Sequence, residues 1–245
     1  MSAPASQAEA ANHACVQPGW LKRLAHDLRD PITPLRFAVQ QMQTGRVQGD
    51  DAVALLRLMD RQIDAMLLIA DEVGDLIKLE RGESLVHRAP AGLSDILAAA
   101  ARIVARAAQA DTAAVAINCD AQSMLVINAD DARLAQLLAH LLRLLGAGTN
   151  TECRPELECE TQGDLILVYV RDRARPIAPS HRLEYLLNGC LPEDQRSLLM
   201  GNLIARQVLE QHQARLSLCK ENAAAGSALI LELKRAELPT FNPVE

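Results

Sequence analysis

Two long stretches near the N-terminus carry apolar residues three or four positions apart, the spacing of a helix with one apolar face. The first covers residues 18–43, and its stripe consists of Leu24, Leu28, Leu35, Val39 and Met42. The second starts near Asp50 or Asp51, either of which can cap it. Its stripe consists of Leu56, Met59, Ile63, Met66, Ala70, Val73 and Ile77. Because Gly45 and Gly49 mark a turn between the stretches, the pattern predicts a helical hairpin over residues 18–84.

Two helices of this length cannot bury both stripes against each other alone. The second stripe alternates spacings of three and four over three heptads, which is typical of a bundle seam. We therefore expect two chains to join their hairpins in a homodimeric four-helix bundle. Gly82 favours the end of the second helix, and residues 85–92 read as a linker. Residues 1–17 are polar and are predicted to be disordered.

The pattern changes beyond residue 92, where short apolar runs alternate with amphipathic stretches. Helices are predicted at 93–108, at 131–145 (opened by Asp130 or Asp131) and at 198–213. Strands are predicted at 114–119, 124–128, 156–160, 165–171, 215–219 and 228–233. Helices set against a mixed sheet make an α/β sandwich, here over residues 93–236 with a tail at 237–245. The expected fold class is therefore a helical hairpin followed by an α/β sandwich.

Composition narrows the classes of partner. Hydrophobic residues make up 49% of the chain, so it is globular, but aromatic residues make up only 2% and the net charge is −6. These values argue against nucleic acid as a partner. No apolar run approaches the ~20 residues of a membrane span, and no signal peptide is visible. The six cysteines form no CxxC pair, so we expect structural thiols in a reducing cytoplasm and no metal site.

One segment of the first predicted helix carries the candidate chemistry, and it reads His26-Asp27-Leu28-Arg29-Asp30-Pro31-Ile32-Thr33-Pro34. His26 lies off the apolar stripe, on a side shared with Asp30 and Thr33, where a partner protein can reach it. Pro31 removes one backbone donor and is expected to bend the helix just past His26. The plain alternative is a solvated helix face with an incidental histidine.

This segment resembles the phospho-acceptor box of two-component sensor histidine kinases, whose usual form is His-Glu-Leu-Arg-Thr-Pro-Leu-Thr. The outright matches are His26, Leu28, Arg29, Pro31 and Thr33. Asp27 and Ile32 are conservative exchanges, whereas Asp30 replaces the usual Thr or Asn. The region beyond residue 92 is similar to the ATP-binding domain of the same family, in the runs 131–138, 165–172, 204–212 and 226–227. The resemblance covers residues 20–235 and implies the family's two-domain fold.

The residues that bind magnesium and the triphosphate in that family are replaced here. The alignment puts His140 and Leu144 at the positions of two asparagines, the second of which binds Mg²⁺ in the family. Leucine has no oxygen to offer this ion, which prefers oxygen ligands. Ala147 stands in the place of the usual lysine.

The family's two glycine boxes are degraded as well. The first retains Asp172, which could still face an adenine amino group, but Ala174 and Pro176 replace glycines that let the backbone approach a ligand. The second reads Leu199-Met200-Gly201-Asn202, and only Gly201 fits. One glycine does not make a phosphate cradle. We therefore expect no ATP and no metal held by this chain, with Asp172 as a residual candidate for nucleotide contact.

The resemblance then implies a phosphorelay protein in which His26 carries a phosphoryl group fuelled by another protein's ATP. His26 would exchange the group with the receiver aspartate of a response regulator, or take it from an upstream histidine kinase, with Mg²⁺ supplied by the receiver. Asp27 would accept a hydrogen from one ring nitrogen, and Arg29 would meet the phosphoryl group or an acidic receiver surface. The carboxylate of Asp30 could activate a water but would also repel the phosphoryl group. The second domain would serve as a docking surface for the receiver.

Three alternatives stay open. The chain could be an active soluble histidine kinase with a divergent pocket, which a nucleotide titration would reveal. It could be a non-catalytic regulator of a histidine kinase or response regulator, whose His26→Ala variant would stay active in the cell. It could also be an unrelated helical interaction protein, on which acid-labile phosphate would never form.

Overall fold

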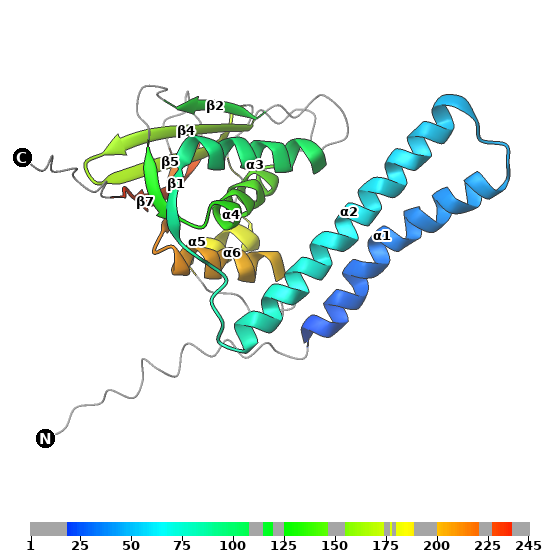
Figure 1. Ribbon diagram of the computed structural model, residues 1–245, viewed down its shortest axis with the longest axis horizontal. Coiled ribbons are helices and arrows are strands. Elements are labelled where there is room, and N and C mark those ends of the chain that lie inside the picture. Colours follow the sequence, from blue (N-terminus) through cyan, green and yellow to red (C-terminus); the bar gives the residue numbers. More distant parts are fainter. Residues whose placement is uncertain are drawn as a thin grey trace, which may run out of the picture. The chain divides into compact units, whose positions relative to one another are not determined.

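The computed structural model describes residues 19–107, 115–119, 125–146, 155–173, 177, 180–188, 200–220 and 227–236 (Figure 1). These residues divide into two compact units, a helical one up to Glu83 and an α/β one that begins at Ser84. Each unit is described by itself. The segments predicted as a disordered N-terminus, 1–17, and as a tail, 237–245, lie outside the described residues.

The first unit is a hairpin of two helices packed side by side, α1 (Gly19–Gln43) and α2 (Gly49–Glu80) (Figure 1). Helix α1 continues through Pro31 and Pro34 as a single element. Pro31 is buried, and Ala38 is fully buried two turns later. The turn contains Gly45 at φ +66°, a left-handed conformation that glycine adopts without strain.

The sequence correctly predicted the C-terminal end of α2 but not the cap at its N-terminal end. The helix begins at Gly49 after Gln48, which makes no side-chain cap, so the prediction that Asp50 or Asp51 caps it was wrong. Both aspartates lie instead in the first turn, where their charge still favours the positive end of the helix dipole. Gly82 has φ +71° and donates its N–H to the carbonyl of Leu79, as expected of a glycine that ends a helix.

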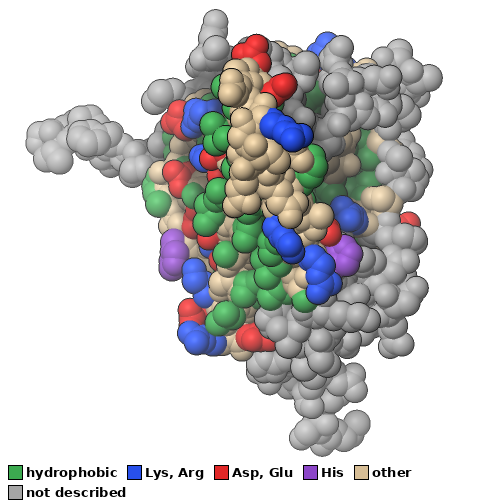
Figure 2. Space-filling model, turned by 90° about the vertical axis from the view of Figure 1, so that its right-hand side faces the viewer, with side chains coloured by type: hydrophobic (Ala, Val, Ile, Leu, Met, Phe, Trp, Pro, Cys, Tyr) green, Lys and Arg blue, Asp and Glu red, His purple; other side chains and the backbone are tan. Residues whose placement is uncertain are grey.

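Many large apolar side chains of the hairpin are open to solvent. Leu67 and Phe37 are more than half exposed, at 58% and 55%. Others that are more than a third exposed are Ile32, Val39, Val53, Leu56, Ile63, Leu68 and Ile77. Figure 2 shows hydrophobic side chains gathered along one face, with charged side chains beside them. No helix among the described residues has the length and apolar character needed to cross a membrane.

The second unit is built on a mixed five-stranded sheet in the order β2-β4-β5-β7-β6. The strands are β2 (Ala116–Cys119), β4 (Pro155–Gln162), β5 (Leu165–Asp172), β6 (Arg215–Lys220) and β7 (Ser227–Lys234). Strand β2 runs parallel to β4, and the remaining neighbours are antiparallel. Along β5 the buried positions alternate as Ile166, Val168, Val170 and Asp172, so one face of the sheet carries the core.

Helices supply the other half of this core. They are α3 (Leu93–Ala107), α4 (Asp131–Leu144), α5 (His181–Asn188) and α6 (Met200–Gln211), and they lie against the sheet as a layer (Figure 1). Helix α4 buries Leu134, Leu138, Leu141 and Leu142 completely. Of the two aspartates that the sequence offered, Asp130 caps α4 by accepting the N–H of Arg133 at 3.0 Å.

Two elements occur where the sequence suggested none. Strand β1 (Ala89–Gly92) lies within the expected linker and pairs antiparallel with β3 (Val126–Ala129). Helix α5 occupies a stretch that was expected to be a loop. Both are short, and β1 contains a proline, so neither has enough periodicity to stand out in the sequence.

The cysteines also differ from the expectation of free thiols. Cys119 and Cys159 form a disulfide with their Cα atoms 4.9 Å apart, while Cys219 is free. The two bonded cysteines are partners in the parallel register of β2 and β4. Their 40-residue separation in the sequence carried no sign of this neighbourhood.

We predict that this disulfide stabilises the second unit by holding the short edge strand β2 to β4. Cys119→Ser should lower the free energy of unfolding by up to about 4 kcal/mol, the loop-closure entropy of a link of this length. Urea titration under non-reducing conditions measures the change. Cys219→Ser is the matched control and should leave the midpoint near that of the wild type. Equal midpoints for Cys119→Ser and the wild type would contradict the prediction.

Candidate functional site

The predicted acceptor histidine lies on an exposed face of α1. The side chain of His26 is 59% exposed, and two carboxylates approach its Nδ1 atom. The Oδ1 atom of Asp27 lies 3.7 Å from it, and the Oδ2 atom of Asp30 lies 3.4 Å from it. One ring nitrogen therefore sits among negative charge, which favours a proton there and leaves the lone pair of Nε2 available.

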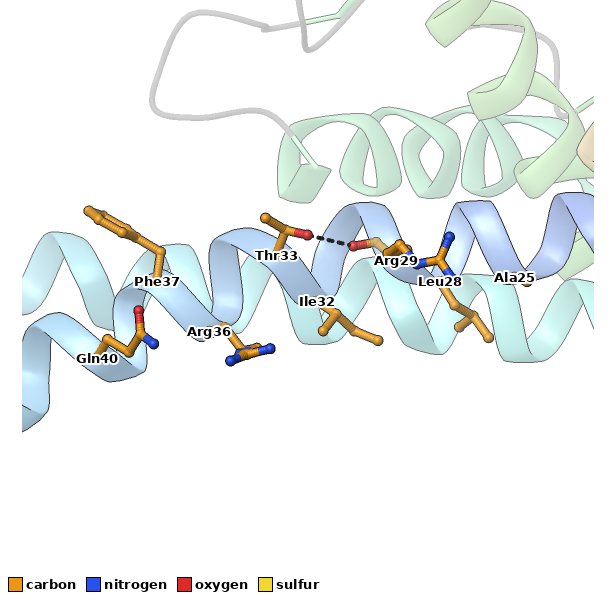
Figure 3. Close-up of a pocket in the computed structure, with 8 residues that line it drawn as sticks. All are labelled: Ala25, Leu28, Arg29, Ile32, Thr33, Arg36, Phe37 and Gln40. Carbon is orange, nitrogen blue, oxygen red and sulfur yellow. Dashed lines mark hydrogen bonds between the residues drawn. The ribbon is translucent and has the colours of Figure 1, made fainter.

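Arg29 and Thr33 continue this part of the helix. Thr33 donates its hydroxyl to the backbone carbonyl of Arg29 at 3.1 Å, as Figure 3 shows. Both residues line an open groove along α1 that also includes Ile32, Arg36 and Phe37. The groove thus combines two guanidinium groups with exposed apolar surface, a combination that suits a protein partner carrying acidic residues.

The second unit has a buried polar contact on the helix that the sequence aligned with the family's asparagines. The Nε2 atom of His140, on α4, lies 2.5 Å from the Oδ1 atom of Asn202, on α6. Asn202 is buried, and its Nδ2 donates to the backbone carbonyl of Arg182, on α5, at 3.1 Å. Since the amide oxygen is the atom facing the imidazole, His140 donates from Nε2. This chain of bonds, which we call the His140–Asn202 clasp, joins three helices.

Burial keeps the imidazole of the clasp neutral. The pKa of His140 is lowered to about 4, mainly by desolvation and also by the positive charges of Arg143 and Arg182, against the opposing effect of the bond to Asn202. The clasp was not predicted from the sequence. The one available signal was Asn202 directly after Gly201, in a box that otherwise has no polar ligand.

A second histidine, His212, ties α6 to the start of α4. Its Nε2 accepts the backbone N–H of Asp130 at 3.1 Å, and its Nδ1 donates to the carbonyl of Val208 at 2.8 Å. Burial lowers the pKa of His212. This side chain satisfies backbone groups at a helix junction and thus has a structural role.

The remaining residues of the degraded boxes are only partly described by the structure. Asp172 is buried at the end of β5, and the next residue, Arg173, binds the carboxylate of the buried Glu156 on β4. Leu144 is half-buried at the end of α4. Ala147, Ala174, Pro176, Leu199 and Gly226 lie outside the described residues. His26, Asp27, Arg29 and Asp30 all belong to the hairpin, and Asp172 belongs to the second unit.

The described architecture, a helical hairpin followed by a mixed α/β unit, is that of histidine kinases. The structure is similar to Acinetobacter baumannii histidine kinase AdeS, with a TM-score of 0.56 and 15% identity over 86% of this chain and 98% of AdeS. It is also similar to histidine kinase ThkA, solved in complex with response regulator protein TrrA, with a TM-score of 0.56 and 16% identity over 88% of this chain and 61% of ThkA.

Full-length ShkA, solved in complex with AMPPNP, matches with a TM-score of 0.51 and 15% identity over 89% of this chain and 46% of ShkA. No protein-family model and no curated protein sequence matches the chain. The resemblance to sensor histidine kinases and the fold class predicted from the sequence are therefore confirmed. Identities of 15–16% show a shared fold, and the chemistry has to be argued from this chain's own residues.

We predict that the His140–Asn202 clasp makes the protein acid-sensitive. The pKa of His140 is lower in the folded chain than the ordinary value of 6.5, so the unfolded chain takes up the proton first. The stabilisation is complete above pH 6.5 and is lost as the pH falls towards 4, by up to about 3 kcal/mol. Urea titrations across this range should show a shallower pH dependence for His140→Gln, which keeps an N–H donor but does not titrate.

The exposed His87 offers a matched control, because His87→Gln removes an imidazole without touching the clasp. Its pH dependence should follow that of the wild type. Parallel curves for His140→Gln and the wild type would show that His140 does not cause the acid sensitivity.

Proposed function

We propose that this chain is a phosphotransfer protein of the two-component type. His26 takes a phosphoryl group from the aspartyl phosphate of a response-regulator receiver, or from an upstream histidine kinase, and passes it on. In the first case the Nε2 lone pair forms the P–N bond while the P–O bond to the receiver carboxylate breaks. The electron pair of that bond leaves with the carboxylate, so no ATP of the chain's own is consumed.

The main support is the setting of His26 on the hairpin. An acceptor needs a nitrogen that a partner can reach, and this side chain is more than half exposed. It also needs the proton on the other nitrogen, and the carboxylates near Nδ1 favour that arrangement. These are features of an acceptor site, and they do not depend on the second unit.

Two described side chains of the second unit, at positions where the family has asparagines, suit neither ATP nor Mg²⁺. His140, at the position of the family's first asparagine, is engaged by Asn202 and kept neutral by burial. Leu144, at the position of the magnesium ligand, offers only hydrocarbon. Phosphoryl transfer from ATP needs metal and donors for the charge of the triphosphate. These residues support a phosphoryl group received from another protein, with the Mg²⁺ brought by the receiver.

The groove on α1 supports a receiver as partner. It begins at Ala25, one residue before His26, and presents Arg29 and Arg36 next to exposed Ile32 and Phe37. Arginines attract the acidic surface around a receiver aspartate and its phosphoryl group. The histidine kinase ThkA, whose fold is similar, was solved with a response regulator bound.

The exposed apolar residues of the hairpin support a homodimer. Leu56, Ile63 and Ile77 belong to the apolar stripe of α2 and are each more than a third exposed. A patch of this extent on one chain marks an interaction surface. A second hairpin would cover it in a four-helix bundle and hold two acceptor histidines on one particle.

We predict that label reaches His26 only through a partner. With radiolabelled ATP and Mg²⁺ alone the protein should stay unlabelled, whereas a labelled phospho-receiver from the same cell should transfer acid-labile phosphate to it. His26→Ala should reduce this label to background, because His26 is the proposed acceptor. His87→Gln, which removes another exposed histidine, is the matched control and should keep the wild-type rate.

Each other result points to one of the competing functions. Label from ATP alone would make the chain an active histidine kinase with a divergent pocket. No label from any phospho-receiver or kinase of the cell would leave a non-catalytic regulator or an unrelated helical interaction protein. Receiver binding without transfer, measured by titration, would favour the regulator.

We predict that the apolar face of the hairpin forms the dimer. The wild type should sediment as a dimer and the double variant Leu56→Glu/Ile63→Glu as a monomer, because each chain would bring two glutamate charges into the buried seam. Arg46→Glu changes an exposed charge in the turn and serves as the control. A monomeric wild type at micromolar concentration would refute the bundle.

A further inference from the structure

The carboxylate nearest to His26 is not the one that the family resemblance designates. The resemblance assigns the role of hydrogen acceptor to Asp27, the residue directly after the histidine. The Oδ2 atom of Asp30 is nearer to Nδ1, at 3.4 Å, than the Oδ1 atom of Asp27, at 3.7 Å. Asp30 is also the one residue of the segment that departs in character from the usual box.

Helix geometry gives this difference a reason. Residues four apart on a helix lie on the same face, one turn above each other, whereas adjacent residues point in directions roughly 100° apart. Asp30 follows His26 by four positions, so the two side chains lie on the same face of the helix. Asp27 reaches the same nitrogen only from the side, and its side chain is less exposed than that of Asp30, at 25% against 65%.

We propose that Asp30 is the residue that positions His26, by holding the proton on Nδ1 and directing the Nε2 lone pair outward. This inference rests on the proposed function for its purpose, since a fixed tautomer matters when Nε2 is to attack phosphorus. It assigns a positive role to the substitution that distinguishes this segment from the family's box.

The chemistry of the step explains why a carboxylate helps at this place. When Nε2 attacks, the P–O bond to the receiver carboxylate breaks and the P–N bond forms. The proton stays on Nδ1, so the ring gains one positive charge as the phosphoryl group arrives. Asp30 lies beside Nδ1, across the ring from the phosphoryl group, where its charge stabilises the new imidazolium more than it repels the phosphate. In the return transfer the P–N bond breaks and the imidazole becomes neutral again, with the proton still on Nδ1 beside Asp30.

A tautomer measurement tests this role without any phosphoryl transfer. In ¹⁵N-histidine-labelled protein at a pH where His26 is neutral, long-range ¹H–¹⁵N spectra distinguish a protonated Nδ1 from a protonated Nε2. The wild type should show His26 mainly as the Nδ1–H form. Asp30→Asn should shift it towards the Nε2–H form that free histidine prefers, and Asp30→Glu should restore the wild-type spectrum. The NMR samples contain EDTA, because a stray cation could bind at this place. His26, Asp27 and Asp30 each offer one ligand atom, and these three atoms lie within 4.8 Å of one another.

Asp27→Asn is the decisive comparison. If Asp30 is the positioning residue, Asp27→Asn should leave the tautomer of His26 near that of the wild type. A shift with Asp27→Asn and none with Asp30→Asn would overturn the proposal and return the role to Asp27. An unchanged spectrum in both variants would overturn it as well.

Transfer kinetics supply the second readout. Asp30→Asn should slow the initial transfer from a labelled phospho-receiver by up to about fivefold, the upper limit for one exposed charge pair. The affinity for the unphosphorylated receiver should not change. Asp60→Asn, an exposed carboxylate on α2, is the control and should keep the wild-type rate. If the wild type accepts no phosphate at all, the proposed function fails, while the spectra still decide whether Asp30 positions the ring.

Discussion

The helical period of α1 constrains everything that the hairpin can do. A helix with one apolar stripe presents that stripe to its neighbours and leaves the opposite side to solvent. Pro31 and Ala38 are buried, so His26, Asp30 and Thr33 fall on the side that stays open. The reactive nitrogen is therefore exposed for the same reason that the helix packs. A change in the spacing of the apolar stripe of α1 would turn His26 towards the packed side of the helix and remove the site.

The second unit separates packing from chemistry. Its core consists of leucines, isoleucines and valines from α3, α4 and the inner face of the sheet, and these residues need no ligand to stay buried. Buried polar groups, in contrast, need hydrogen-bond partners, because an unpaired polar group is costly to bury. The His140–Asn202 clasp meets that requirement and joins α4, α5 and α6.

The two units thus differ in where their polar and reactive side chains lie. The hairpin carries an accessible imidazole, a groove with two arginines and an apolar face suited to a second copy. The α/β unit is held together internally by its core, by the disulfide between β2 and β4, and by histidines engaged with neighbouring helices. The chain thus combines the architecture of a histidine kinase with an exposed imidazole on the hairpin and a second unit whose described histidines bind neighbouring helices.

Local pattern was sufficient for the long helices, for the outward side of His26, for an aspartate at the start of α4 and for Gly82 as a helix end. Each of these features depends on residues within one or two turns. It failed for the cap of α2, where competing aspartates stand close together, and for β1 and α5, which are too short to show a period. The pairing of Cys119 with Cys159, the contact of His140 with Asn202 and the closer approach of Asp30 than Asp27 to the imidazole all came from the three-dimensional arrangement. The first two join residues 40 and 62 positions apart, whose meeting is set by strand register and helix packing. The third depends on side-chain directions on one helical turn, which residue order does not express.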